Sequence, residues 1–383
     1  MDFRPTEEQE LVIKSLTELL QREAPESQMA ELDKNHEFPW SAWRALADNG
    51  FLGLGVPEEY GGTPTDVMTL ILVCEAMGKL ACPVAAVYIT SIIISRDILQ
   101  FGSEKQKHEI LRGLVKGDPP IALGITEPQA GSDVSGIRTS ATLEGDDYVF
   151  NGQKIYTSMA NIAKYILLMT RDANIENPYK GMSMWLMPTD TKGVRINTLD
   201  KVGGWTIPAC EVFIDGAVLP KDALVGELNN GWKQLMANFE IERLATAAVP
   251  VGAAQAAFED AIAYANQRVQ FGQLIGSFQL VQEMLTRMAI KIETMRNLIY
   301  KVAWMMDNNM DVRIENAMAK LYCAQSTFEV IDDAMQILGG LGYMMDHRVQ
   351  RLWRDSRAYR IGGGTDQVMV TIIGSQLLKK HKR

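Results

Sequence analysis

The spacing of hydrophobic and polar residues divides the 383-residue chain into three stretches. Up to about residue 120, apolar residues recur at helical spacing. The motif Thr-Glu-Glu-Gln at residues 6–9 forms a capping box that opens the first helix, and Ser103 opens a later one. Apolar helices are expected near residues 67–80 and 85–101. This pattern predicts an N-terminal helical domain over residues 1–120.

The pattern changes between residues 121 and 230, where short β-rich runs alternate with turns. Asp146-Asp147 and Asn151-Gly152 supply the turn chemistry of hairpins. We expect a small antiparallel β domain here, with a mobile loop at residues 174–181. The expected strands lie at residues 141–143, 148–151, 165–170, 183–187, 194–199 and 211–214.

The helical period returns from residue 231 to the end. Long helices are expected over residues 232–267, 278–307, 314–338 and 368–379, with glycine-rich joints at 272–276, 339–342 and 362–364. These four helices predict a C-terminal bundle over residues 231–383. The fold class is therefore mainly α with a central β domain: an N-terminal helical bundle, a small antiparallel β domain and a C-terminal four-helix bundle.

Composition narrows the possible functions. The content of 47% hydrophobic and 22% charged residues is that of a soluble globular protein, and the net charge of −9 argues against a nucleic-acid partner. The longest apolar run, residues 83–95, is shorter than the roughly 20 residues of a membrane span, so we expect a buried helix and no membrane span. The scattered cysteines (Cys74, Cys82, Cys210, Cys323) and histidines indicate no disulfide framework and no metal site. With no secretory pattern at the start, we expect a cytoplasmic protein.

Two motifs carry chemical information. Residues 124–136 read Gly-Ile-Thr-Glu-Pro-Gln-Ala-Gly-Ser-Asp-Val-Ser-Gly and follow an apolar run. Small residues let the backbone approach a flat ligand, and the N–H groups of such a loop can bind ring heteroatoms or phosphate. Residues 336–343 read Gln-Ile-Leu-Gly-Gly-Leu-Gly-Tyr and precede Asp346, Arg351 and Asp355. Either motif alone could be an ordinary turn or helix joint, but their combination is far more specific.

Both motifs resemble the signatures of the acyl-CoA dehydrogenase family, and the likeness extends over essentially the whole chain. The resemblance implies FAD as cofactor. It implies that residues 123–132 form the wall against the isoalloxazine edge, with Thr126 bonded to the flavin, Tyr156 against the ring and Ser158 near N5. Arg268 and Phe271 would reach the FAD of a neighbouring subunit. The implied cofactor positions are Leu123, Ile125, Thr126, Ser132, Tyr156, Ser158, Arg268, Phe271, Gln279, Gln336, Gly340, Thr365 and Gln367.

The catalytic base is where this chain departs from many relatives. They carry a glutamate in the last FAD-contact segment, and Gly363 stands at that position here. A subset of relatives places the base on a C-terminal helix in a Glu-Arg-Leu context, which Glu242 matches. The resemblance thus implies Glu242 as base and the Gly363 N–H as a donor to the thioester oxygen. A solvated helical carboxylate is the alternative for Glu242, and Asp366 is the fallback base.

The resemblance also implies substrate contacts. Glu240 and Arg243 match positions that contact CoA, and Ser132 adjoins substrate as well as cofactor. Tyr88, Ile89 and Ile92 lie on a helix that borders the acyl pocket in relatives, and their bulk suggests a short pocket. Trp205 stands where many relatives have a polar or basic residue.

The implied activity is FAD-dependent α,β-dehydrogenation of an acyl-CoA, with electrons passed to electron transfer flavoprotein. Within the family the chain resembles bacterial crotonobetainyl-CoA reductase and short-chain acyl-CoA dehydrogenases, so the reverse reaction, enoyl-CoA reduction, is an alternative. A catalytically silent flavoprotein scaffold and an acyl-CoA oxidase are the others. The family is commonly tetrameric, and a role of Arg268 in a neighbouring subunit requires at least a dimer.

Overall fold

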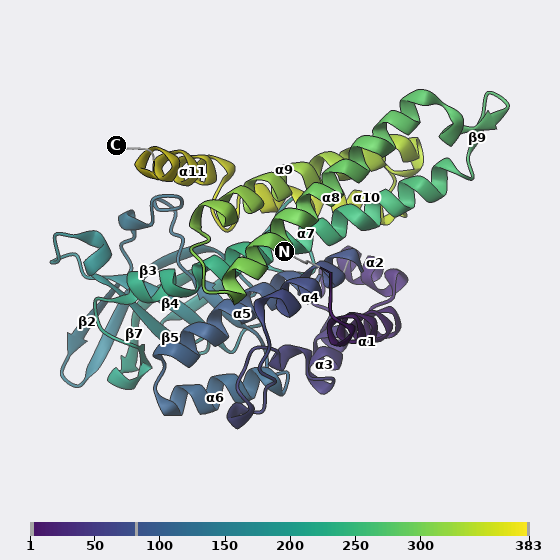
Figure 1. Cartoon of the computed structure of the whole chain (residues 1–383). Helices are drawn as coiled ribbons and strands as arrows, with labels where there is room; N and C mark the ends of the chain where they lie inside the picture. The colour runs from purple at the N-terminus through teal and green to yellow at the C-terminus, as the bar shows by residue number, and fades with distance from the viewer. Residues whose placement is uncertain (1–3, 81–82, 381–383) are drawn as a thin grey trace.

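The computed structural model describes residues 4–80 and 83–380, in which helices, strands and helices follow one another in the predicted order (Figure 1). The predicted fold class is confirmed. The domain limits at residues 120 and 230 stay a prediction, and Cys82 lies outside the described residues.

The N-terminal helices begin where the sequence provides caps. Thr6 accepts from the Gln9 N–H and Gln9 reciprocates, so the predicted capping box opens the first helix. Ser103 and Gln106 form a second box. The helix at Glu26–Asn35 was not predicted, because it begins after Pro25 with no side-chain cap. The helices are α1 (Glu7–Glu23), α2 (Glu26–Asn35), α3 (Trp40–Asp48), α4 (Val67–Lys79), α5 (Val84–Phe101) and α6 (Glu104–Val115).

The middle stretch forms two four-stranded sheets, ordered β1-β4-β5-β8 and β2-β3-β7-β6. All six predicted strands are present. The predicted antiparallel β domain is present, and one strand departs from the pattern, because β1 pairs with β4 in parallel. Asn177 and Pro178 form a short 3-10 turn inside the loop expected to be mobile. The strands are β1 (Ile121–Gly124), β2 (Ser140–Glu144), β3 (Asp147–Ser158), β4 (Tyr165–Arg171), β5 (Met182–Pro188), β6 (Val194–Leu199), β7 (Ala209–Pro220) and β8 (Leu224–Val225).

The C-terminal stretch is built on one long helix that packs against α4, α5, and two other long helices. A two-stranded hairpin projects from one end of these helices, and the final helix lies at the other end (Figure 1). The helix that precedes the last glycine-rich joint was not predicted. The elements are α7 (Gly231–Ala265), β9 (Val269–Gln270), β10 (Gln273–Leu274), α8 (Gln279–Asp307), α9 (Arg313–Leu338), α10 (Arg348–Ser356) and α11 (Asp366–Lys380).

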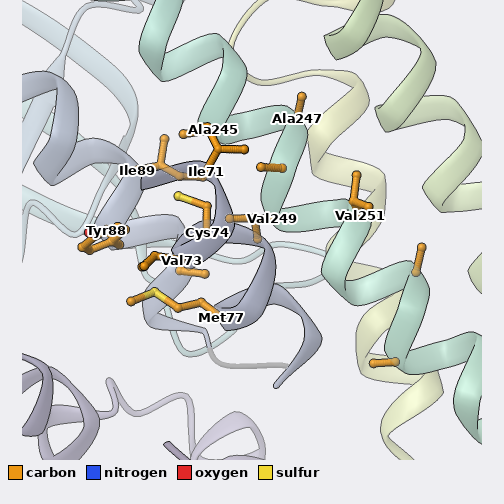
Figure 2. Close-up of a cluster of buried hydrophobic side chains, with 14 of the residues drawn as sticks. Ile71, Val73, Cys74, Met77, Tyr88, Ile89, Ala245, Ala247, Val249 and Val251 are labelled. Carbon is orange, nitrogen blue, oxygen red and sulfur yellow. The ribbon is translucent and has the colours of Figure 1, made fainter. Parts of the chain in front are cut away.

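A single apolar core joins the two helical regions. Figure 2 shows its centre, where Cys74 and Met77 of α4 and Ile89 of α5 lie against Ala245 and Val249 of α7. Gly78 of α4 and Gly252 of α7 allow the close contact, since a Cβ on either would lie 1.9 Å from a backbone oxygen of the opposite helix. Among the described residues, α5 alone is long and apolar enough to cross a membrane, yet most of it is buried in this core, as the sequence predicts.

Asp307 ties the end of α8 to the start of α4. Its carboxylate accepts from the Val67 N–H at 2.7 Å and the Met68 N–H at 3.0 Å, while Asp66 accepts from the Thr69 N–H at 2.8 Å. The first N–H groups of a helix have no partner within the helix, and a negative charge near them interacts favourably with the positive end of the helix dipole. Two carboxylates, one from each helical region, therefore satisfy the start of a core helix.

We predict that Asp307→Ala lowers the free energy of unfolding by about 1–2 kcal/mol, the usual range for loss of a helix N-cap. Two helical N–H groups lose their acceptors at once. Urea unfolding followed by circular dichroism measures the change. Asp48→Ala, at an exposed residue of α3, is the control. Equal stability of the two variants would contradict the role given to Asp307.

Candidate active site

The loop at residues 124–136 is fastened by a buried carboxylate. Glu127 is 4% exposed and accepts hydrogen bonds from the N–H groups of Arg138 and Thr139, at 2.7 and 2.9 Å, and from the Thr139 hydroxyl at 2.6 Å. The ammonium group of Lys154, on β3, lies 2.7 Å from Glu127 and 3.0 Å from the carbonyl oxygen of Ile125. Glu127 is thus a structural acid that fixes the loop to β3.

The charges of this pair depend on each other. Burial raises the pKa of Glu127, but Lys154 and the Thr139 hydrogen bonds outweigh it, so the carboxyl pKa lies below its usual range. Burial lowers the pKa of Lys154 to about 8 although Glu127 opposes this change. Both groups are charged at neutral pH, and neither could remain so in this position without the other.

The end of β3 presents an open aromatic ring beside this loop. The register with β7 shifts between Lys154 and Thr157, and Tyr156 at the shift has a left-handed backbone (φ 57°). The Ile155 N–H donates to the Thr126 carbonyl oxygen at 2.9 Å, which joins loop and bulge. A bulge redirects a side chain, and here Tyr156 is 67% exposed. This bond brings Thr126 to the bulge that carries Tyr156, and Ser158 is exposed two residues further along the strand. An exposed ring on a left-handed backbone fits a flat cofactor such as an isoalloxazine.

Glu242 and Gly363 lie side by side. Glu242 points from α7 toward the loop between α10 and α11, and a Cβ built on Gly363 would lie 3.8 Å from its Oε1. The same Cβ would lie 3.4 Å from the Thr246 methyl group, one turn along α7. Gly363 has φ 63°, which disfavours any other residue. The structure therefore brings the carboxylate of Glu242, on α7, next to Gly363, the loop position that carries no carboxylate in this chain.

The surroundings of Glu242 differ from those of a solvated helical carboxylate. Its Oε2 is buried without a hydrogen-bond partner. Burial raises the pKa of Glu242 to about 7, although the charges of Arg243 and Lys320 oppose the rise. Among the described hydrogen bonds of the neighbouring loop, the N–H groups of Ile361 and Gly362 are used and that of Gly363 is not. An unpartnered acceptor and an unpartnered donor thus belong to two residues that lie next to each other.

Asp366, the fallback base, is 5% exposed, and its Oδ1 is buried without a hydrogen-bond partner. Its Oδ2 accepts from Arg360 Nε at 2.8 Å and from Gln325 Nε2 at 3.1 Å. Sequence reasoning missed Lys320 of α9, which is 1% exposed and whose ammonium group donates to the Gly364 carbonyl oxygen. A lysine on the apolar face of a predicted helix, one turn from Ala317 and Ala324, was the available signal.

Glu240 and Arg243 form a second polar group on α7. Arg243 donates to Glu240 at 2.9 Å, and Asn316 of α9 donates to the Glu240 carboxylate and carbonyl oxygens, both at 2.7 Å. Arg243 Nε and Asn316 Oδ1 are buried without partners. Buried polar atoms are rarely left unpaired, so this cluster has free capacity for the polar groups of a ligand.

The residues predicted at the acyl pocket lie in the apolar core around α7. Tyr88 and Ile92 of α5 are 2% and 5% exposed and belong to the cluster that contains Ile241 and Ala245, which flank Glu242 (Figure 2). The Tyr88 hydroxyl has no hydrogen-bond partner, and burial raises its pKa well above the usual value. The residues predicted at the acyl pocket are therefore bulky, buried side chains of the helical core, with one unpaired hydroxyl.

The remaining predicted cofactor residues divide into two groups. Thr365 caps α11 through the Val368 N–H at 3.2 Å and lies with Gln367 beside Gly363. Arg268 and Phe271 lie in the hairpin after α7, and roughly 35 Å of helix separates Glu242 from this end, at about 1.5 Å per residue. Phe271 is 93% exposed. The residues at this far end are Arg268, Phe271, Gln279, Gln336 and Gly340.

Trp205 has a structural explanation. Its ring stacks on His36 with centroids 4.9 Å apart, and the guanidinium of Arg354 lies 3.8 Å from the ring centroid on a cation–π contact. Its Nε1 donates to the Lys201 carbonyl oxygen at 2.8 Å, and Arg354 also bonds Asp33 at 2.6 Å. The aromatic residue joins the β domain to α2 and α10, away from Glu242.

Comparisons with known proteins identify the family. Three family models match the chain: the acyl-CoA dehydrogenase N-terminal domain at residues 6–118, middle domain at 122–217 and C-terminal domain at 229–378. The chain is 44% identical to the probable acyl-CoA dehydrogenase YdiO of Escherichia coli K12 over 383 residues, covering 100% of both. The chain belongs to the acyl-CoA dehydrogenase family, as the sequence predicts.

Solved structures agree with this assignment. Butyryl-CoA dehydrogenase from Megasphaera elsdenii is 31% identical, with a TM-score of 0.93 over 99% of this chain and 100% of that one. A chain from the structural study of the electron transferring flavoprotein of Acidaminococcus fermentans is 32% identical, with a TM-score of 0.93 over 99% of this chain and 100% of that one. The prediction of FAD as cofactor is confirmed at the level of the family, which includes FAD-dependent dehydrogenases.

We predict that Lys154→Met lowers the free energy of unfolding by about 3–5 kcal/mol, because it leaves the buried Glu127 charge without its partner. The double variant Lys154→Met/Glu127→Gln should recover part of this loss, and urea unfolding of all three variants measures it. Since the pKa of Glu127 is lowered in the folded state, its contribution is complete above the unfolded pKa of about 4 and is lost as the pH falls through the folded value. Additive losses in the double variant would contradict the coupling.

Proposed function

We propose that this chain is an FAD-dependent acyl-CoA dehydrogenase in which Glu242 removes the α-proton of an acyl-CoA thioester. The observation that carries the proposal is the half-buried Glu242, whose Oε2 is buried without a partner, beside Gly363, whose N–H makes none of the described hydrogen bonds. With a pKa of about 7, Glu242 is ionised in a large part of the molecules at neutral pH and can still hold a proton after transfer. Both properties are required of a general base.

The surrounding residues orient the thioester. The Gly363 N–H can donate to its carbonyl oxygen, which makes the α-C–H more acidic because it stabilises enolate-like charge. The free positions of Arg243 and Asn316 suit the polar groups of CoA, and the apolar wall of Tyr88 and Ile92 suits a short acyl chain. FAD, when bound, supplies the acceptor for the β-hydride.

Thr126, Tyr156, Ser158 and Thr365 are the residues of this chain that would hold the ring system of FAD. The far-end group, which includes Arg268, Phe271 and Gln336, cannot serve the same site, because the length of α7 separates them. We therefore propose that a second copy of the chain supplies this group, in a homo-oligomer such as a tetramer. The exposed hairpin that carries Phe271 supports this assembly (Figure 1).

The proposed direction of the reaction and the proposed electron acceptor are those of the family. Electron transfer flavoprotein is the proposed acceptor of electrons, supported by the likeness to a chain from the Acidaminococcus structural study. The same site operating in reverse would reduce an enoyl-CoA. A cytoplasmic location is also proposed, in keeping with the buried free thiols of Cys74, Cys210 and Cys323.

An anaerobic screen of flavin bleaching with short, branched, aromatic and betainyl-CoA esters tests the function. We predict that Glu242→Gln slows bleaching by about 10²–10⁴-fold with the best ester, because the amide cannot accept the proton. In the wild type the rate should rise with pH to a plateau, with a midpoint near the Glu242 pKa of about 7, since only the ionised form is a base.

Two comparisons make this test specific. Glu259 lies on α7 like Glu242 and forms a partly exposed ion pair with Lys79 of α4. Glu259→Gln should therefore leave the rate unchanged. Asp366→Asn should retain far more activity than Glu242→Gln. Unchanged bleaching in Glu242→Gln would remove Glu242 as base. A wild type that no acyl-CoA bleaches would favour the silent scaffold, and peroxide formed in air would favour an oxidase.

We predict that Arg268→Ala weakens FAD retention by about 10–100-fold, the effect of losing a hydrogen bond from a charged donor. The cause would be a lost phosphate contact contributed by the neighbouring subunit. Released FAD is measured by fluorescence after gel filtration, with the exposed Arg22→Ala on α1 as control. Sedimentation of an FAD-loaded wild-type monomer would contradict the assembly.

A further inference from the structure

Lys320 is a buried lysine whose role the proposed function leaves open. It lies on α9 with 1% of its surface exposed, on the face that also carries Asn316, Cys323 and Thr327. A buried ammonium group costs free energy unless hydrogen bonds or opposite charges compensate for it. The hydrogen bonds and charges that compensate for the burial of Lys320 therefore indicate its role.

One compensation is a hydrogen bond to the glycine-rich loop. The ammonium group donates to the carbonyl oxygen of Gly364. Gly363 and Gly364 both have left-handed backbones, with φ of 63° and 96°, so the loop turns sharply where it passes Glu242. Among the described hydrogen bonds, Lys320 is the one side chain that holds the peptide after these two residues. It therefore fastens the loop that presents the Gly363 N–H.

The other compensation is electrostatic. The carboxylates of Asp366 on α11 and Glu242 on α7 raise the pKa of Lys320, while burial and the charge of Arg243 lower it, with burial the largest effect and a result of about 8. Asp366 already accepts from Arg360, and Arg243 already donates to Glu240. Among the described residues, Glu242 makes no hydrogen bond to any cation. Lys320 in turn makes no hydrogen bond to a carboxylate there, so its charge is the one nearby that is not already paired in this way.

We propose that Lys320 is a positioning residue of the active site: it holds the Gly363–Gly364 loop against Glu242, and its charge keeps the buried Glu242 carboxylate available as a base. This inference rests on the proposed function. In this proposal Lys320 acts through Glu242 and through the loop. Its two effects are separable, since one requires a hydrogen-bond donor and the other a positive charge.

Three substitutions separate the two effects. Lys320→Met removes donor and charge, Lys320→Gln keeps a donor for the Gly364 oxygen, and Lys320→Arg keeps the charge. Without the charge, we expect the midpoint of the rise of bleaching rate with pH to shift to higher pH by roughly one unit. The rate at pH 7 then falls about fivefold and recovers above pH 9. Lys320→Met should also have a lower plateau at high pH, which Lys320→Gln restores, and Lys320→Arg should keep the wild-type midpoint.

A second readout does not require turnover. The infrared band of the protonated Glu242 carboxyl, assigned by its loss in Glu242→Gln, is titrated in wild type and in each Lys320 variant. Its midpoint should rise by the same roughly one unit in the Met and Gln variants. If no acyl-CoA bleaches the wild type, the proposed function fails, and this titration still decides whether Lys320 sets the charge of Glu242.

Lys291→Met is the matched control, because it removes a lysine that bonds Glu329 at 2.7 Å between α8 and α9 and is not part of this site. It should change neither midpoint. If Lys320→Met does not fold, Lys320→Gln carries the test alone. Wild-type midpoints in both readouts for a folded, FAD-loaded Lys320→Gln would overturn the electrostatic role, and an equal plateau for Met and Gln would overturn the anchoring role.

Discussion

A carboxylate inside an apolar core is stable only if its charge is compensated or if it takes up a proton, and the placement of Glu242 on α7 obeys this constraint. Helix α7 is buried along most of its length because α4, α5, α8 and α9 surround it. The pKa of Glu242, about 7, is the balance between that burial and the charges of Arg243 and Lys320. One acid of the helical core thus lies where burial and the charges of two cations act on its pKa in opposite directions.

The glycine at position 363 is the other half of the same arrangement. A Cβ there would lie in ordinary van der Waals contact with Thr246 and Glu242, and it is the left-handed backbone that disfavours a side chain. Glu242 takes the space that a side chain of the loop would fill, and the loop contributes only its backbone N–H. A carboxylate on α7 and a carboxylate on the loop at residue 363 would therefore occupy neighbouring positions in space although they belong to different elements.

Some of this architecture could be predicted from local sequence, and some could not. The helix starts at Thr6 and Ser103 depend on side chains three residues apart, and the glycine at 363 pointed to Glu242 through the family resemblance. The parallel pairing of β1, the uncapped start of α2, and the burial of Lys154 and Lys320 depend on contacts between distant segments. A lysine in a helical or strand pattern reads as a surface residue until its partner is known, and Glu127 lies 27 residues from Lys154 in the sequence.

The two buried lysines show how the two faces of the site are related. Lys154 fixes the loop at residues 124–136 by neutralising Glu127, and that loop bonds the backbone beside Tyr156. Lys320 fixes the loop at residues 363–364 from the opposite side, while its charge reaches Glu242. In both places one ammonium group donates to a backbone carbonyl oxygen of a glycine-containing segment and so fixes that segment. Rigid backbone donors aimed at a reacting group cost no reorganisation during the reaction, and this is the condition under which hydrogen bonds to an enolate are most effective.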